Sequence, residues 1–289
     1  MEHTVTNDEA NLRVDKIIKN VCGQIGYVFL QKLFRLGKIK VNGKKVAASD
    51  RLYPGDLIKI FAKLDELPKV KSIPNEKMFD QLRSMIIFEN DNFFAINKPT
   101  GLAVQLGTKV SVCVETFIKS YPNHTCHLVH RLDKDTSGVL LVAKNLQYAR
   151  KLTELFRKNR IRKTYIAIVS GKISQAGIME SCLTKSFVGN EEKMRVASSG
   201  KKAITFYNPL KELENFTLLE LKPTTGRKHQ LRVQCAEVLN APIIGDKKYN
   251  RHWRHKELLL HAHKVFLEDW GIEITAEIPK YFYEMISVS

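Results

Sequence analysis

Hydrophobic positions in the first sixty residues follow two different spacings. In LRVDKIIKNV and VFLQKLFRLGKI the apolar residues recur near helical spacing, which predicts two short amphipathic helices, the second ending at Gly37. KIKV and KKV flank Asn42-Gly43, a pair that favours a type I′ hairpin turn, and LYPGDLIKIF adds a turn and a closing strand. We therefore predict a small α+β domain over residues 12–63, preceded by an N-terminal tail, residues 1–11.

A second and larger domain is indicated further along the chain. Residues 64–81 contain two prolines and little apolar periodicity, which is typical of an extended linker. MIIFENDNFFAINKP has strand-like runs around a polar turn and predicts a hairpin. GVLLVAK and KTYIAIVSG are expected to be strands, and between them Asn145 should cap the basic amphipathic helix LQYARKLTELFRKNR. We place this domain at residues 82–289.

Composition excludes several classes of protein. The hydrophobic fraction is 44%, and no apolar run approaches the roughly 18 residues that a membrane span requires. The N-terminus lacks a basic segment followed by an apolar one, so no secretory signal is expected. Five scattered cysteines without a C-x-x-C pair indicate neither a disulfide framework nor a zinc finger. A cytoplasmic protein in a reducing compartment is the expectation.

The charge of the chain is strongly positive. A net charge of +17 and a pI near 9.6 attract polyanions, and nucleic acid is the leading partner, although charge alone does not separate RNA from DNA or an anionic membrane. Residues 12–63 hold twelve Lys and Arg against three Asp. Such an excess is often only a solvated face, but its repetition over both helices and the hairpin favours contacts with phosphates. This block, through LRVDKII and GKIKVNGKKVAASDRLYPGDLIKI, resembles the S4 RNA-binding module.

Two segments concentrate the residues that could perform chemistry. HLVHRLDKDTSGVLLVAK places Asp133 and Asp135 in a loop before a strand, where aspartates are usually turn formers. In LKPTTGRKHQLRVQCAEVLNAPIIGDKKY, Thr225 and Gly226 could open a helix carrying arginines, and a helix N-terminus with an arginine suits a carboxylate or phosphate. Taken alone, these arginines could equally be solvated surface charges.

Three motifs of this chain, taken in their order along the sequence, resemble the RluA family of RNA pseudouridine synthases: HRLDKDTSGVLLVAK, KTYIAIVSG and TTGRKHQLRV. NKPTGLAV and LLLHAHKVFLE also match, so the resemblance spans most of residues 82–289, and VQLGT and EKMRVASSGKKAITFY lean toward the large-subunit ribosomal RNA enzymes. It implies an α+β catalytic domain with a mixed, largely antiparallel sheet flanked by helices and a cleft across the sheet. It implies no cofactor and no metal.

The resemblance also implies roles for individual residues. Asp133 would be the catalytic carboxylate, acting as a nucleophile at C1′ or as a base on the ribose, and the sequence does not choose between them. Asp135 would be structural. Arg131 would occupy the space left by the flipped uridine, Arg227 would pair with Asp133, and Tyr165 would pack on the flipped base.

The remaining candidates concern the pocket wall and the phosphates. Leu231 would supply an apolar wall, and five residues are candidates for phosphate contacts: Lys98, His130, Lys163, His229 and Arg232. The chain departs from the family pattern at Gln234, where the family commonly has histidine, and at Asn240 and Asn250, where it has glycines. Asparagine tolerates positive φ, so these changes need not disturb the fold.

Two other functions compete with this interpretation. A metal-dependent nuclease or phosphotransferase would use Asp133 and Asp135 to bind Mg²⁺, but the segment offers no third acidic ligand. An RNA-binding assembly factor without catalysis would keep the basic face, although Asp133, Tyr165 and Arg227 are all present. With no coiled-coil pattern, we expect a monomer that binds RNA, most simply ribosomal RNA, and no membrane.

Overall fold

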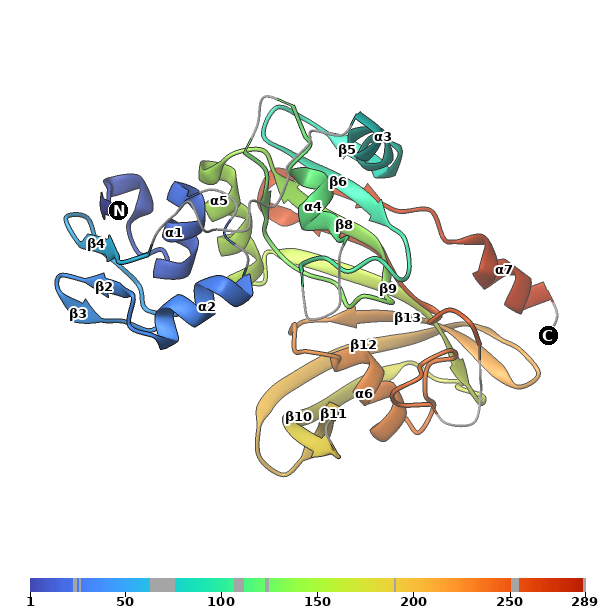
Figure 1. Cartoon of the computed structure of the whole chain (residues 1–289). Coiled ribbons are helices and arrows are strands. Elements are labelled where there is room, and N and C mark those ends of the chain that lie inside the picture. Colours follow the sequence, from blue (N-terminus) through green and yellow to red (C-terminus); the bar gives the residue numbers. More distant parts are fainter. Residues whose placement is uncertain are drawn as a thin grey trace. The chain divides into compact units, whose positions relative to one another are not determined.

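The computed structural model describes residues 1–22, 25, 27–62, 76–106, 112–122, 125–189, 191–250 and 255–287. The chain divides into two compact units, Met1–Ile73 and Pro74–Ser289 (Figure 1). No helix in the described ranges is both long and apolar enough to cross a membrane.

The N-terminal unit packs two helices on a four-stranded sheet. The helices are α1 (Val14–Cys22) and α2 (Tyr27–Arg35), and the strands are β1 (Glu2–Thr4), β2 (Ile39–Val41), β3 (Lys44–Lys45) and β4 (Leu57–Ile60), in the order β1-β4-β2-β3. Asn42 and Gly43 have φ values of 49° and 78°, so the predicted type I′ turn is confirmed. Gly37, with φ 65°, follows α2 as predicted.

The predicted N-terminal tail is wrong, because its first residues belong to this sheet. β1 pairs antiparallel with β4, and a short 3-10 helix, Asn7–Glu9, follows it. Val5 is only 2% exposed and joins the core formed by α1, α2 and the sheet. A three-residue strand is too short to give an alternating pattern, so the sequence alone did not reveal it.

The C-terminal unit is built on one large mixed sheet. Its strand order is β11-β10-β12-β13-β9-β14-β8-β6-β5, with β15 paired to β14 and β7 to β8. Between the named strands, the β8–β14 pairing is parallel and the others are antiparallel, as expected from the resemblance. The strands are β5 (Ile86–Glu89), β6 (Phe93–Lys98), β7 (His127–Leu128), β8 (Ser137–Ala143), β9 (Ile161–Ser170), β10 (Gly177–Val188), β11 (Glu191–Ala197), β12 (Lys201–Glu212), β13 (Phe216–Pro223), β14 (Leu260–Leu267) and β15 (Ile272–Thr275).

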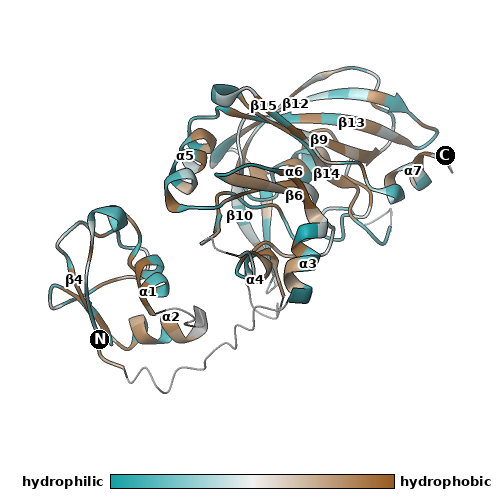
Figure 2. Ribbon diagram, turned by 90° about the horizontal axis from the view of Figure 1, so that it is seen from above, coloured by the Kyte–Doolittle hydropathy of each residue, from teal (hydrophilic) through white to brown (hydrophobic). Residues whose placement is uncertain are grey.

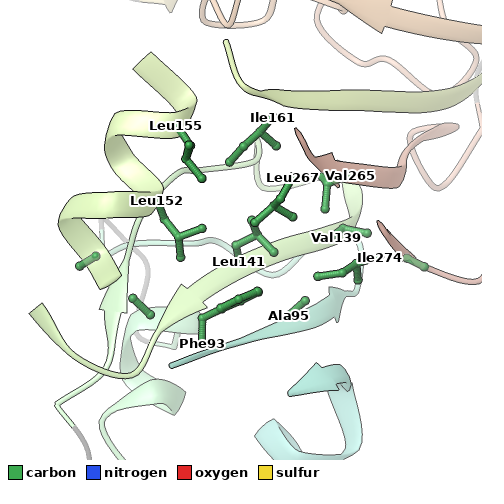
Figure 3. Close-up of a cluster of buried hydrophobic side chains, with 13 residues drawn as sticks. Phe93, Ala95, Val139, Leu141, Leu152, Leu155, Ile161, Val265, Leu267 and Ile274 are labelled. Atoms are coloured by element: carbon green, nitrogen blue, oxygen red, sulfur yellow. The ribbon is translucent and has the colours of Figure 1, made fainter. Parts of the chain in front are cut away.

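Helices cover both faces of the sheet. They are α3 (Glu76–Met85), α4 (Val114–Ile118), α5 (Leu146–Arg157), α6 (Gln230–Glu237) and α7 (Lys280–Ser287), with a 3-10 helix at Glu268–Trp270. Leu152 and Leu155 of α5 meet Leu141 on one face of β8 (Figure 3), while Leu140 packs with α3 and α4 on the other. Both faces of the central strands are therefore buried, which explains the uninterrupted apolar run of β8 and the brown β6 in Figure 2.

The predicted linker over residues 64–81 is wrong in its second part. Residues 76–81 belong to α3, whose Leu82 is fully buried beside the partly buried Met78 and Met85. These three apolar residues lie four and three positions apart, so they share one face of a helix whose other residues are mostly polar. Residues 64–75 lie outside the described ranges. Asn145 caps α5 as predicted, since its side chain accepts a hydrogen bond from the Tyr148 amide.

Candidate active site

Asp133 lies in the loop that joins β7 to β8. Leu132, just before it, is 6% exposed and anchored in the core with α3 and α4, and the Thr136 amide donates a hydrogen bond to the Asp133 carbonyl at 3.2 Å. The loop enters β8 at Gly138, where φ is +110° and an added Cβ would lie 2.2 Å from the Ala262 carbonyl oxygen. Only glycine fits this crossing. The Asp133 side chain stays 22% exposed.

Lys98, at the end of β6, is bonded to this loop through the carbonyl of Lys134. Its ammonium donates hydrogen bonds to the carbonyls of Pro99, Leu102 and Lys134 at 2.9, 2.9 and 3.0 Å, and its side chain is fully buried. Burial lowers the pKa of Lys98 to about 7, although Asp135 and Asp133 act to raise it. The prediction that Lys98 contacts a phosphate is therefore wrong, because three main-chain acceptors occupy its three donors.

The cation beside Asp133 is Arg232 of α6. Its Nη1 donates to Asp133 Oδ2 at 3.3 Å, while Nε and Nη2 bind both oxygens of Asp246 at 2.7 and 2.8 Å. Asp246 is fully buried and also accepts the amides of Lys248 and Tyr249. Burial acts to lower the pKa of Arg232, but its pairing with Asp246 and Asp133 outweighs burial and raises it. The guanidinium is thus locked in place by Asp246 and presents its remaining edge to Asp133.

The prediction that Arg227 pairs with Asp133 is wrong. Residues 225–229 do not open a helix, because α6 begins only at Gln230. The Gln230 side chain accepts hydrogen bonds from the Thr225 hydroxyl and the Arg227 amide, which closes this loop. Arg227 is left exposed, with its Nε donating to the Lys202 carbonyl at 3.0 Å. Arg232 lies inside α6 and is buried. The sequence indicated Arg232 only as a phosphate contact and did not reveal that it is the partner of Asp133.

His229 faces Asp133 on a second side. Its Nε2 lies 3.9 Å from Asp133 Oδ2, and its Nδ1 is 2.8 Å from the Tyr249 hydroxyl, which also accepts the Met194 amide. Burial lowers the pKa of His229 to about 4, although Asp133 acts to raise it. The imidazole is therefore neutral, and its contact with a phosphate stays a prediction. Its φ of 53° lies in the left-handed region, which non-glycine residues adopt infrequently.

Tyr165 and Leu231 form an apolar side of the site. Tyr165, on β9, is partly buried and packs both with the cluster that contains residues of α3 and α4 and with the cluster that contains Leu231 of α6. Burial raises the pKa of Tyr165, and the charge of Asp133 raises it further, so the phenol is protonated. The effect of Asp133 also indicates that its carboxylate lies near the Tyr165 hydroxyl. Leu231, 7% exposed, belongs to the same cluster as Tyr165. Their roles toward a base remain predictions.

Three further candidates lie around this loop. Arg131 is exposed next to the buried Leu132. His130 does not face solvent anions: its Nε2 accepts the Leu141 amide at 2.8 Å, its ring lies 4.4 Å from that of Phe156, and burial lowers its pKa to about 3. His130 is a neutral acceptor that fixes the loop to β8, so its prediction as a phosphate contact is wrong. Burial also lowers the pKa of Lys163, whose phosphate contact stays a prediction.

The departures from the family pattern have structural partners. Gln234 is fully buried: its carbonyl accepts the Thr205 hydroxyl and its amide donates to the carbonyls of Met179 and Ala203, which fastens α6 to β10 and β12. Asn240 has φ 51°, as its substitution for glycine predicted. Asn250 keeps a negative φ and donates to the Ile243 carbonyl at 3.1 Å.

Other parts of the surface do not carry this chemistry. A hollow of about 750 Å³ is lined by β9, β13 and β14 residues such as Arg162, Glu220 and Phe266, but neither Asp133 nor Tyr165 lines it. Within the described ranges, no group of three or more His, Cys, Asp or Glu side chains is placed to hold a metal ion. The convergence of Asp133, Arg232, His229 and Tyr165 therefore defines the candidate site.

Comparison with known proteins gives this arrangement a family. The model of RNA pseudouridylate synthases matches residues 92–237, a range that contains all four of these residues. Ribosomal large subunit pseudouridine synthase C of Rickettsia felis is 38% identical over 96% of both chains, and the enzyme of that name from Vibrio parahaemolyticus is 33% identical over 85% of this chain and 78% of its own. Among solved structures, human RNA pseudouridylate synthase domain containing 4 is 28% identical, with a TM-score of 0.61 over 73% of this chain and 94% of its own. The chain belongs to the RNA pseudouridylate synthase family.

Proposed function

We propose that this protein isomerises uridine to pseudouridine in large-subunit ribosomal RNA, with Asp133 as the catalytic carboxylate. The observation that carries the proposal is the partly exposed Asp133 carboxylate, 3.3 Å from an arginine that is itself locked by a buried aspartate. Through this hydrogen bond the guanidinium holds the Asp133 carboxylate in a fixed direction. The names of relatives that align over most of both chains support the ribosomal substrate.

The reaction needs one carboxylate and no net change in composition. The N1–C1′ bond of uridine breaks, the uracil rotates, C1′ bonds to C5, and the C5 proton leaves while N1 gains one. The Asp133 carboxylate could attack C1′ or remove a ribose proton, and the arrangement serves both routes. Tyr165, protonated and beside Asp133, would pack on the uracil ring and hold it while it turns.

Binding of folded RNA requires extraction of the target nucleotide and contacts to its backbone. Unstacking a base costs a few kcal/mol, and we propose that the exposed Arg131 occupies the vacated space beside Asp133. The N-terminal unit, with twelve Lys and Arg in residues 12–63, would act as an S4-like module that binds phosphates. We further propose a monomer that works in a reducing cytoplasm, where its five free cysteines remain thiols.

The proposal is tested by release of tritium from large-subunit ribosomal RNA labelled at C5 of uridine. Wild type should release tritium with or without EDTA, because no step uses a metal. Asp133→Asn should release none while binding the same RNA with unchanged affinity. Release that vanishes with EDTA, or that continues in Asp133→Asn, would contradict the assignment. Labelled fragments would then locate the modified uridines.

A further inference from the structure

The most exposed large hydrophobic side chain in the described part of the protein is Phe187. It is 70% exposed near the end of β10, directly opposite Glu192 of β11. Leu183, four residues earlier on the strand, is 2% exposed and packs with Val233 of α6. Because residues an even number of positions apart point to the same face, Phe187 projects on the face that carries α6 and hence Arg232.

The β10–β11 hairpin is fastened to the edge of the candidate site. Glu192 binds Lys228 at 2.6 Å, and Lys228 directly precedes His229, the residue that faces Asp133. The Met194 amide donates to the Tyr249 hydroxyl, which contacts His229 in turn. These contacts tie the hairpin that carries Phe187 to the segment of His229 and to Tyr249, at the edge of the candidate site.

The surroundings of Phe187 are strongly basic. The hairpin and the two loops that hold it carry seven Lys and Arg side chains against three glutamates, Glu180, Glu191 and Glu192, each of which is already bound by a lysine. A fourth acid, Asp246, is buried against Arg232. The seven cations are Lys185, Lys193, Arg195, Arg227, Lys228, Lys247 and Lys248. Lysines are depleted in the centres of protein–protein interfaces, whereas an aromatic ring among cations is typical of a surface for single-stranded nucleic acid.

A uridine is flipped most easily out of unpaired RNA, whose neighbouring bases can splay out and stack on exposed aromatic rings. The lysines around such a ring can neutralise the phosphates of the same strand. We propose that Phe187 stacks on a base flanking the target uridine, and that the lysines of the hairpin follow the adjoining backbone. This inference rests on the proposed function, since it assumes that the strand leaving the site is RNA.

The experiment combines Phe187→Ala with RNA fragments in which one flanking nucleotide at a time lacks its base. Stacking of one base is worth about 1–3 kcal/mol, so Phe187→Ala should raise Kd and KM by roughly 5- to 150-fold and leave kcat at saturating RNA unchanged. One abasic position should cause the same loss in wild type and no additional loss in Phe187→Ala. Phe187→Tyr should restore binding. The matched control is Ile178→Ala, on the opposite face of the same strand and 53% exposed, which should change nothing.

Each other outcome overturns the inference. If every abasic fragment weakens wild type and Phe187→Ala by equal factors, Phe187 contacts no base. If Phe187→Ala binds fragments normally but loses affinity for ribosomal particles, the ring contacts a protein instead. Kd is measured without turnover, so the stacking of Phe187 can be tested even if the protein is not a synthase. A wild type that binds the fragments but releases no tritium would contradict the proposed function and leave the Kd comparison of wild type and Phe187→Ala intact.

Discussion

Replacing Arg232 with methionine should separate the two functions of this guanidinium. Asp246 is completely buried, and its carboxylate would lose both bonds to Arg232. Breaking a buried ion pair from one side costs about 3–5 kcal/mol of unfolding free energy. The amides of Lys248 and Tyr249 still donate to Asp246, so we expect the lower end, about 3 kcal/mol. The double variant Arg232→Met, Asp246→Asn should recover most of this loss, because no buried charge then remains unpaired.

Catalysis should not recover with stability. Asp133 would lack its cation in both variants, and a hydrogen bond to a charged group is worth about 1.5–3 kcal/mol. If the bond acts fully in the transition state, the tritium-release rate should fall by roughly 10- to 150-fold in the single and the double variant alike. Arg227→Met is the matched control, since the Arg227 side chain is exposed and its Nε donates to the Lys202 carbonyl, not to Asp246.

The assay is single-turnover tritium release at saturating enzyme, beside urea unfolding of each variant. We expect Arg227→Met to keep the stability and the chemical rate of wild type. If Arg227→Met lost the chemical rate while the double variant Arg232→Met, Asp246→Asn kept it, then Arg227, and not Arg232, would be the cation that assists Asp133. Recovery of both stability and rate in the double variant would show that Arg232 acts only as a structural partner of Asp246.

Three further variants test separate parts of the site. The pKa of Lys98 is about 7 in the folded protein and 10.5 for an ordinary lysine, so the unfolded chain binds more protons between these pH values. The unfolding free energy of wild type should therefore rise with pH over this range by up to roughly 5 kcal/mol. Lys98→Met should lack this rise when urea unfolding is compared at pH 7 and pH 10. Tyr249→Phe should cost about 1 kcal/mol and slow tritium release several-fold, because His229 loses the partner that fixes its ring; an unchanged rate would contradict that role. Gly138→Ala should destabilise by about 3 kcal/mol or more in thermal melts, since the new Cβ meets the Ala262 carbonyl; a native melting temperature would show that the strands can separate.

Local elements were predictable because their signals are contiguous in the sequence. Asn42-Gly43 specifies its turn through two adjacent residues that tolerate positive φ, and Asn145 caps α5 through an amide three residues away. The short β1 strand and the polar α3 helix were missed because their stability comes from packing on distant residues.

The site was only partly predictable for the same reason. A motif located Asp133, but its partner comes from a residue 99 positions away, and the sequence offered two arginines five residues apart. The choice between them depends on where α6 begins, which the Gln230 side chain decides through contacts to Thr225 and Arg227. Likewise, Lys98 and His130 look like phosphate ligands in the sequence, and only their main-chain partners show that they support the loop.

The central claim is that the Asp133 carboxylate converts uridine to pseudouridine. The most direct measurement is site-by-site detection of pseudouridine, as carbodiimide-dependent reverse-transcription stops, in large-subunit ribosomal RNA incubated with wild type or Asp133→Asn. We expect stops at discrete uridines with wild type and none with Asp133→Asn, although both proteins bind the RNA equally. Stops of equal strength with Asp133→Asn would show that Asp133 is not the catalytic carboxylate.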